Sequence, residues 1–235
     1  MQVYHLLSAE NGISDIALKR IRVSRVRDLN DPFELLAAKL DNKNYRVGLQ
    51  SWRKEFNEKH GLLCFSKDWS NPVLWSHYAV KHRGICLGFE LANEIAEEVT
   101  YVSDRMPLRF EGGDPMKGVE STYVRDLLTT KFVHWNYEGE VRVFVDLDES
   151  TSESGSYFYP FDEKLRLSQV ILGPLCELPI GEIRSLVHST YEDVAVFKAS
   201  LAYKSFAVVL DGDSVSEEDA YWKEKSVRRP HKGDI

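Results

Sequence analysis

The sequence predicts a single α+β domain over residues 1–212, with a mostly antiparallel mixed sheet flanked by helices, followed by a polar C-terminal tail over 213–235. Three observations support this prediction. Short apolar runs with strand character alternate with capped helical segments along the chain. No internal repeat or low-complexity linker divides them. The length of 235 residues suits one large domain with a substantial core.

Composition is typical of a soluble, cytoplasmic protein. The net charge of −7 disfavours a general affinity for nucleic-acid backbones. Cys64, Cys86 and Cys176 lie in apolar runs without the spacing of metal ligands, so we expect reduced core thiols and no metal site. No basic leader precedes an apolar core at the N-terminus, and no stretch approaches the roughly 18 apolar residues of a membrane span, so no membrane association is expected.

The first sixty residues predict a strand, a sharp turn and two helices. Residues 3–7 form a short apolar strand. The Asn-Asp-Pro sequence at 30–32 indicates a turn that starts a helix, with Glu34 in the first helical turn, where a carboxylate suits the helix dipole. Residues 35–60 are charged and favour helix, and the polar run at 41–44 indicates a break between two helices.

The central stretch 64–89 packs a strand, a capped helix and a second strand into one unit. Asn71-Pro72 predicts the start of a helix that runs to residue 82, before Gly84 ends it. Trp75 and Tyr78 share one helical face. Ser66, His77 and Tyr78 gather polar groups near the strand ends and are candidate ligand-binding residues. The alternative is an aromatic helix that simply packs on a sheet.

The second half of the chain predicts further strands around a helix and a mobile loop. Glycine and proline residues indicate the loop at 105–118. Helical spacing of apolar residues predicts a helix over 119–135. Strands are predicted at 141–145, 167–172, 194–198 and 205–210.

Glu138 and Glu140 form a second candidate site. On a strand, two carboxylates two residues apart point the same way, with Arg142 next on that face. One interpretation is that Glu140 and Arg142 form an exposed pair of side chains on one face of the strand. The other is a carboxylate that stabilises positive charge at a sugar carbon during glycosidic cleavage. Sequence patterns of phosphate-binding loops, serine hydrolases and zinc proteases are absent.

Several blocks together resemble the DUF2971 family of bacterial and phage proteins. They are LNDPFE (29–34), CFS (64–66), LWSHYA (74–79), HRGICLGF (82–89), VTY (99–101) and the run from Lys131 through WNYEGEVR (135–142).

The order of these blocks is also similar, more distantly, to ADP-ribosyltransferases of the DarT-like kind. That resemblance implies an ADP-ribosyltransferase-like fold and NAD as substrate. It implies Glu140 as the catalytic glutamate and Glu138 as the acceptor-orienting one. Tyr78 or Trp75 would stack on nicotinamide, and Tyr4 or His5 would supply the first-strand contact.

Three functions follow as hypotheses. The first is an NAD-dependent ADP-ribosyltransferase-like enzyme or NAD-cleaving effector, in a bacterial toxin or anti-phage defence, with a protein or nucleic acid as acceptor. The second is a non-catalytic module of a defence system that binds a nucleotide or a protein. The third is a nucleic-acid-processing enzyme, which the net charge disfavours.

Overall fold

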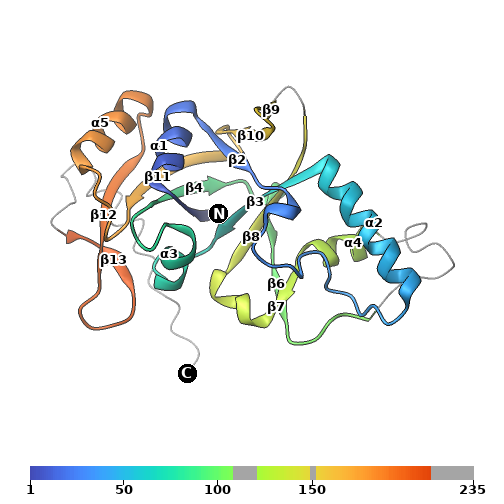
Figure 1. Ribbon diagram of the computed structural model, residues 1–235. Coiled ribbons are helices and arrows are strands. Elements are labelled where there is room, and N and C mark those ends of the chain that lie inside the picture. Colours follow the sequence, from blue (N-terminus) through green and yellow to red (C-terminus); the bar gives the residue numbers. More distant parts are fainter. Residues whose placement is uncertain (108–120, 149–151, 213–235) are drawn as a thin grey trace. The chain divides into compact units, whose positions relative to one another are not determined.

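The computed structural model describes residues 1–107, 121–148 and 152–212, and Figure 1 labels most of its helices and strands. The described chain forms two compact units that are interleaved along the sequence. The first holds Met1–Val3, Lys19–Asp68 and Glu90–Arg166, and the second holds Tyr4–Leu18, Trp69–Phe89 and the chain from Leu167. Helices accompany a large, mostly antiparallel mixed sheet, so the predicted α+β class is confirmed. The single domain over 1–212 stays a prediction.

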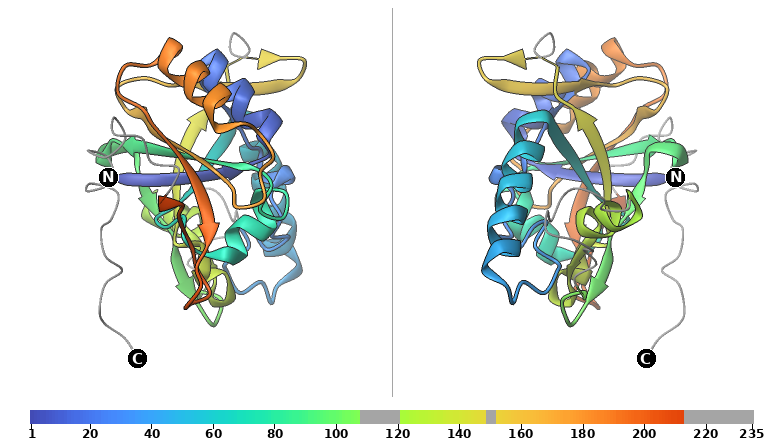
Figure 2. Two further views of the ribbon diagram at one scale, coloured as in Figure 1. Left: turned by 90° about the vertical axis from the view of Figure 1, so that its left-hand side faces the viewer. Right: turned by 90° about the vertical axis from the view of Figure 1, so that its right-hand side faces the viewer.

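Three antiparallel strands form the main sheet of the first unit. β8 (Glu140–Asp146) lies between β3 (His60–Ser66) and β5 (Glu97–Glu98). β3 and β8 run side by side in both views of Figure 2. Their register places Cys64 opposite Arg142 and Ser66 opposite Glu140. The strand predicted at 141–145 is therefore β8.

Two smaller sheets and several helical segments belong to the same unit. β10 (Ser156–Pro160) pairs antiparallel with β2 (Arg20–Val23) and β9 (Ser152–Glu153). β6 (Thr100–Val102) and β7 (Thr130–Phe132) form a parallel pair. The helical segments are α2 (Lys43–Lys59), α4 (Ser121–Leu128), η1 (Val26–Asp28), η2 (Asn93–Ile95) and η3 (Val133–Glu138). The helix predicted over 119–135 is thus three elements, α4, β7 and η3.

The segment after Asp31 is a turn, whereas the sequence predicted the start of a helix. Asp31 Oδ1 accepts a hydrogen bond from the backbone N–H of Phe33 at 2.9 Å. Leu35 then adopts a φ of +60°, a left-handed conformation that is unfavourable for an L residue with a side chain. The Leu35 side chain is fully buried in an apolar cluster, which holds the strained turn in place. That cluster contains Val26, Leu62 and Leu128.

Only one helix, α2, occupies residues 35–60, where two were predicted. The side chain of Asn42 accepts a hydrogen bond from the backbone N–H of Asn44 at 2.8 Å. Asn42 therefore caps the N-terminus of α2. The polar run at 41–44 marks the start of this helix and not a break between two.

The second unit has five neighbouring strands with three helices. The strand order is β13 (Val208–Leu210), β12 (Ala195–Leu201), β11 (Leu165–Leu172), β4 (Ile85–Leu91) and β1 (Gln2–Leu7). β11 and β12 are parallel, and β12 and β13 are antiparallel. The helices are α1 (Ala9–Leu18), α3 (Pro72–Tyr78) and α5 (Ile180–Thr190).

Helix α3 is shorter than predicted. Its start is as expected, because Asn71 Oδ1 accepts from the backbone N–H of Val73 at 2.9 Å. It ends at Tyr78, and residues 80–82 follow with φ values of 47°, 53° and 69°. This left-handed turn replaces the last predicted helical turn. Gly84 follows this turn. A Cβ atom at position 84 would lie 2.1 Å from the Leu7 carbonyl oxygen, so a larger residue does not fit there.

Two sequence predictions concern segments that the structure describes only in part or not at all. Most of the loop at 105–118 and the tail at 213–235 lie outside the described residues. Within the described ranges, no helix combines the length and the apolar character that a membrane crossing requires.

Candidate functional site

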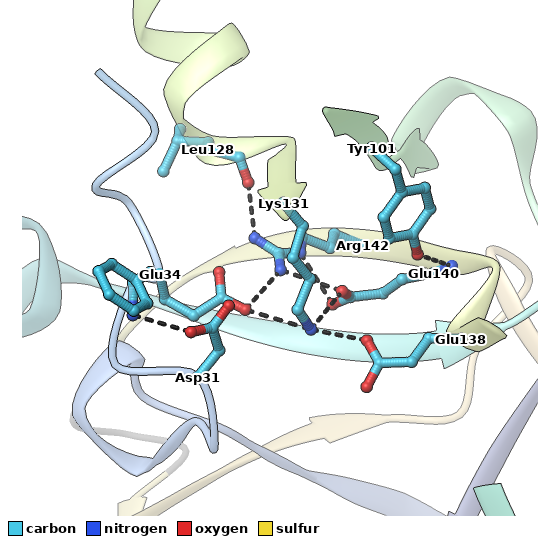
Figure 3. A network of polar contacts seen from close by, with 9 residues as sticks. Asp31, Glu34, Tyr101, Leu128, Lys131, Glu138, Glu140 and Arg142 are labelled. Atoms are coloured by element: carbon cyan, nitrogen blue, oxygen red, sulfur yellow. Dashed lines mark hydrogen bonds and ion pairs between the residues drawn. The ribbon is translucent and has the colours of Figure 1, made fainter. Parts of the chain in front are cut away.

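Glu138 and Glu140 lie at the start of β8, where their side chains are buried in the first unit. Glu138 ends η3 and Glu140 begins β8, with Gly139 between them at a φ of +50°. The two carboxylates therefore do not belong to one regular strand. Both nevertheless reach the same ammonium group, that of Lys131 on β7, as Figure 3 shows. The interpretation of Glu140 and Arg142 as an exposed pair of side chains is wrong, since Arg142 is completely buried.

Lys131 joins three carboxylates. Its Nζ donates to Glu138 Oε2 at 2.6 Å and to Glu140 Oε2 at 3.2 Å, and it lies 3.4 Å from Glu34 Oε1. Burial alone would lower the pKa of Lys131, but the charges of these three carboxylates raise it above its ordinary value. Lys131 is therefore a fixed positive charge and not a base.

Arg142 closes the network on the side of β8. Its Nε and Nη2 donate to the two oxygens of Glu140 at 2.8 and 3.0 Å, which is the bidentate geometry of a strong ion pair. Nη2 also donates to Glu34 Oε1 at 2.8 Å, and Nη1 to the carbonyl oxygen of Leu128 at 2.7 Å. Burial would raise the pKa of Glu140, yet the charge and hydrogen bonds of Arg142, with Lys131, hold it below its ordinary value.

Glu34 is the unusual member of the network. It is only 2% exposed, and both of its cationic neighbours contact the same oxygen, Oε1. The other oxygen, Oε2, is buried and has no hydrogen-bond partner among the described residues. Burial raises the pKa of Glu34 above its ordinary value, although Arg142 and Lys131 act in the opposite direction. Such a carboxyl keeps its proton more readily than an ordinary glutamate does.

A cavity of about 300 Å³ in the first unit has Glu34 and Lys131 in its lining. Polar lining is contributed by Asp31, Ser103, Asp104, Arg105 and Thr130, and apolar lining by Phe33, Leu36, Ala37, Val102 and Phe132. Ligand pockets of proteins range from about 300 to 1,000 Å³, so this cavity suits a single substituted ring. A larger ligand has to extend out of it.

The structure gives the predicted site residues different environments. Glu140 and Glu138 are buried in ion pairs, and neither lines the cavity. Ser66 lies at the end of β3, where its Oγ donates to the Asp68 carbonyl at 2.7 Å and accepts from the Asp68 N–H at 3.1 Å. These two bonds explain Ser66 as a local turn residue at the end of a strand.

Five predicted ligand-binding residues belong to the second unit. Trp75 is completely buried, and its indole N–H donates to the Trp69 carbonyl oxygen at 2.6 Å, so it is a satisfied core residue without a free ring face. Tyr4 is also buried, and His5 is half-buried. His77 is exposed, with its ring centroid 6.1 Å from that of the half-buried Tyr78. Roles in ligand binding for Tyr4, His5, His77 and Tyr78 stay predictions.

Sequence reasoning missed Glu34, Lys131 and Arg142 as site residues. The sequence predicts Glu34 as a carboxylate in a first helical turn, and Lys131 as part of a helix over 119–135. Both explanations rest on local patterns, whereas the contact between Arg142 and Glu34 joins positions 108 residues apart.

No group of three or more histidine, cysteine or acidic side chains in the described part of the chain is arranged to hold a metal ion. Comparison of the sequence and structure with known protein families, curated proteins and solved structures gives no match.

Proposed function

We propose that the cavity of the first unit is a ligand site and that the protein is an ADP-ribosyltransferase-like enzyme or NAD-cleaving effector. The observation that carries the proposal is an excess of buried negative charge. Among the described residues, the network joins three carboxylates to two cations. The carboxylate with a free oxygen, Glu34, is the one that lines the cavity.

This charge pattern suits the cleavage of a nicotinamide glycoside. In NAD the nicotinamide ring is positively charged. When the bond between its nitrogen and the ribosyl carbon breaks, the electron pair leaves with nicotinamide and the positive charge passes to the ribosyl group. A nucleophile then attacks that carbon and loses its proton. One positive charge stays on the reacting groups until that proton leaves, and one excess buried carboxylate stabilises it.

Glu34, and not Glu140, is the carboxylate that faces the reacting group. The resemblance implied Glu140, but the oxygens of Glu140 are both occupied by Arg142 and Lys131. Glu34 has an unoccupied oxygen and is therefore the better candidate for the carboxylate that stabilises the ribosyl cation. Glu140 would then act indirectly, by fixing Arg142 and Lys131 around Glu34.

Nicotinamide release from NAD by the purified protein tests the proposal. The wild-type protein should release nicotinamide, and Glu34→Gln should reduce turnover by about 10²- to 10³-fold, since it removes one stabilising group from the transition state. Glu98→Gln is a matched control, because Glu98 is an exposed carboxylate of the same unit that pairs with Lys67. Absence of nicotinamide release, with and without added protein or nucleic-acid acceptors, would rule out the enzyme.

A non-catalytic nucleotide-binding module is the second candidate. The ion pairs that occupy Glu138 and Glu140 favour it, because they leave these carboxylates no direct role in chemistry. In that case NAD, ADP-ribose or ATP should raise the melting temperature without turnover, since a ligand that binds only the folded state stabilises it. A melting temperature that none of the three shifts would contradict both candidates.

A further inference from the structure

Within the described part of the chain, the network beside the cavity holds one more carboxylate than it holds cations, and this excess negative charge indicates the charge of the ligand. We propose that it is a site for a flat organic cation, and that the cation enters in exchange for the proton of Glu34. This inference deepens the proposed function and rests on its first half, that the cavity binds a ligand. It does not depend on the cleavage of NAD.

The contacts of Glu34 are compatible with a protonated and with an ionised carboxyl group. Oε1 accepts from Arg142 at 2.8 Å and lies 3.4 Å from Lys131, while Oε2 has no partner among the described residues. When Oε2 carries a proton, the network is balanced, with Glu138 and Glu140 opposite Lys131 and Arg142. When the proton leaves, the network has one uncompensated negative charge at the cavity. Burying such a charge is unfavourable unless a cation accompanies it.

The exchange therefore conserves charge. In the empty cavity Glu34 is a neutral acid. In the occupied cavity it is a carboxylate beside the positive ligand, and the proton has passed to the solvent. The total charge of cavity and network is the same in both states, which avoids the cost of burying a net charge.

The other charged groups around Glu34 favour a positive ligand. Arg142 and Glu140 face it from β8, Lys131 from β7 and Glu138 from η3 through Lys131. Asp31 and Asp104 add two acidic groups to the cavity lining, and Arg105 adds one basic group. The surroundings of Glu34 are thus acidic overall, so the part of a ligand that lies beside Glu34 should be a cation and not a carboxylate or phosphate.

Two aromatic rings make a flat cation the best fit. Phe33 and Phe132 both line the cavity, and they are 57% and 47% exposed. The guanidinium carbon of Arg105 lies 5.1 Å from the centroid of the Phe33 ring, so this ring already has a flat cation of the protein over one face. The cavity of about 300 Å³ leaves space for roughly one ring.

The test uses two ligands with the same ring and different charge. Nicotinamide is neutral, and 1-methylnicotinamide is a cation. Calorimetry at one pH in two buffers of different ionisation enthalpy gives both the affinity and the number of protons released. We expect the cation to bind at least about tenfold more tightly than nicotinamide, with release of up to one proton per cation bound. Below the pKa of Glu34, the affinity for the cation should rise up to about tenfold per pH unit.

Glu34→Gln should abolish the proton release and bring the two affinities to within about twofold, because the amide cannot ionise. Glu98→Gln, which removes an exposed carboxylate that is not part of the network, should change neither result. The ligand pair and the proton count are measured on the wild-type protein, so the test does not depend on the folding of a variant. Equal affinities, no proton release with the cation, or no binding of the cation would each overturn the inference.

The two proposals can fail separately. Binding of 1-methylnicotinamide with proton release, but without cleavage of NAD, would leave the cation site standing and remove the enzyme. Cleavage of NAD by a protein that does not distinguish the two ligands would support the enzyme and overturn the cation site.

Discussion

The network in the first unit has two sides. On the closed side, on β8, Glu140 is paired through both of its oxygens. On the open side, at the turn after Asp31, Glu34 lines the cavity and has one oxygen that is unpaired among the described residues. Glu140 on the closed side and Glu34 on the open side are buried to nearly the same extent. Their pKa values nevertheless move in opposite directions, down for Glu140 and up for Glu34. Burial opposes ionisation in both, so the difference comes from the donors. Both oxygens of Glu140 accept hydrogen bonds from cations, whereas only one oxygen of Glu34 does.

A buried carboxylate whose oxygens are all paired contributes to the fold and has no capacity left for a ligand. A buried carboxylate with a free oxygen at a cavity is unfavourable for the fold, and a ligand can relieve it. Substitutions on the closed side should therefore reduce stability, and substitutions on the open side should change ligand binding.

Arg142→Met should have the largest effect. It leaves Glu140 and Glu34 buried without their main cation and the Leu128 carbonyl without its donor. Breaking a buried ion pair by removing one partner typically costs about 3–5 kcal/mol. Urea denaturation at pH 7 measures the loss. Arg125→Met is the control, because its ion pair with Glu97 is largely exposed and contributes little. Similar losses in the two variants would contradict the structural role of Arg142.

Glu140→Gln should come next, with a loss of about 2 kcal/mol at pH 7, since the amide keeps the shape but not the charge-assisted bonds. The pKa of Glu140 is lowered in the folded state, so its stabilising effect is full above the ordinary value of 4.5 and is lost as pH falls through the lowered pKa. The difference between wild type and Glu140→Gln should therefore shrink in acid. A difference that is constant between pH 7 and pH 3 would show that the charge of Glu140 does not matter.

Glu34→Gln should behave in the opposite way. The pKa of Glu34 is raised in the folded state, so wild-type stability should fall as pH rises from 4.5 through the raised pKa. The slope from one group cannot exceed about 1.4 kcal/mol per pH unit. Glu34→Gln should lack this decline and equal or exceed wild-type stability at pH 7. Loss of stability in Glu34→Gln at pH 7 would indicate that Glu34 is a paired carboxylate like Glu140.

The difference between the two sides also explains what the sequence could predict. The α+β class, the strand of β8 and the cap at Asn71 follow from local patterns of polarity and turn residues, and the structure contains them. The Glu138-Gly139-Glu140 sequence drew attention to the closed side for the same reason, because a repeated charge is visible along the chain.

The open side depends on contacts that local patterns do not show. Glu34 is positioned by the left-handed conformation of Leu35 and by the burial of that side chain. Neither feature can be read from residues 30–36, which predict a regular helix start. The ion pairs with Lys131 and Arg142 connect it to distant positions, so a single sequence gives no sign of them.

Tyr101→Phe should have the smallest effect, on the hydrogen bond that starts β8. The Tyr101 hydroxyl accepts the backbone N–H of Glu140 at 2.8 Å, as Figure 3 shows. Removing the hydroxyl leaves this N–H without an acceptor in a partly buried position, at a cost of about 1 kcal/mol. Burial raises the pKa of Tyr101 to about 12, so the neutral hydroxyl persists at the pH of the measurement.

Amide hydrogen exchange resolves this small change. In Tyr101→Phe the Glu140 amide should exchange faster, since its protecting hydrogen bond is gone. The Val143 amide is the internal control, because Val143 lies within the same strand and pairs with Leu63 of β3. Faster exchange at both positions would mean that β8 as a whole is loosened. Unchanged exchange at Glu140 would mean that the closed side is held by the ion pairs of Arg142 and Lys131 alone.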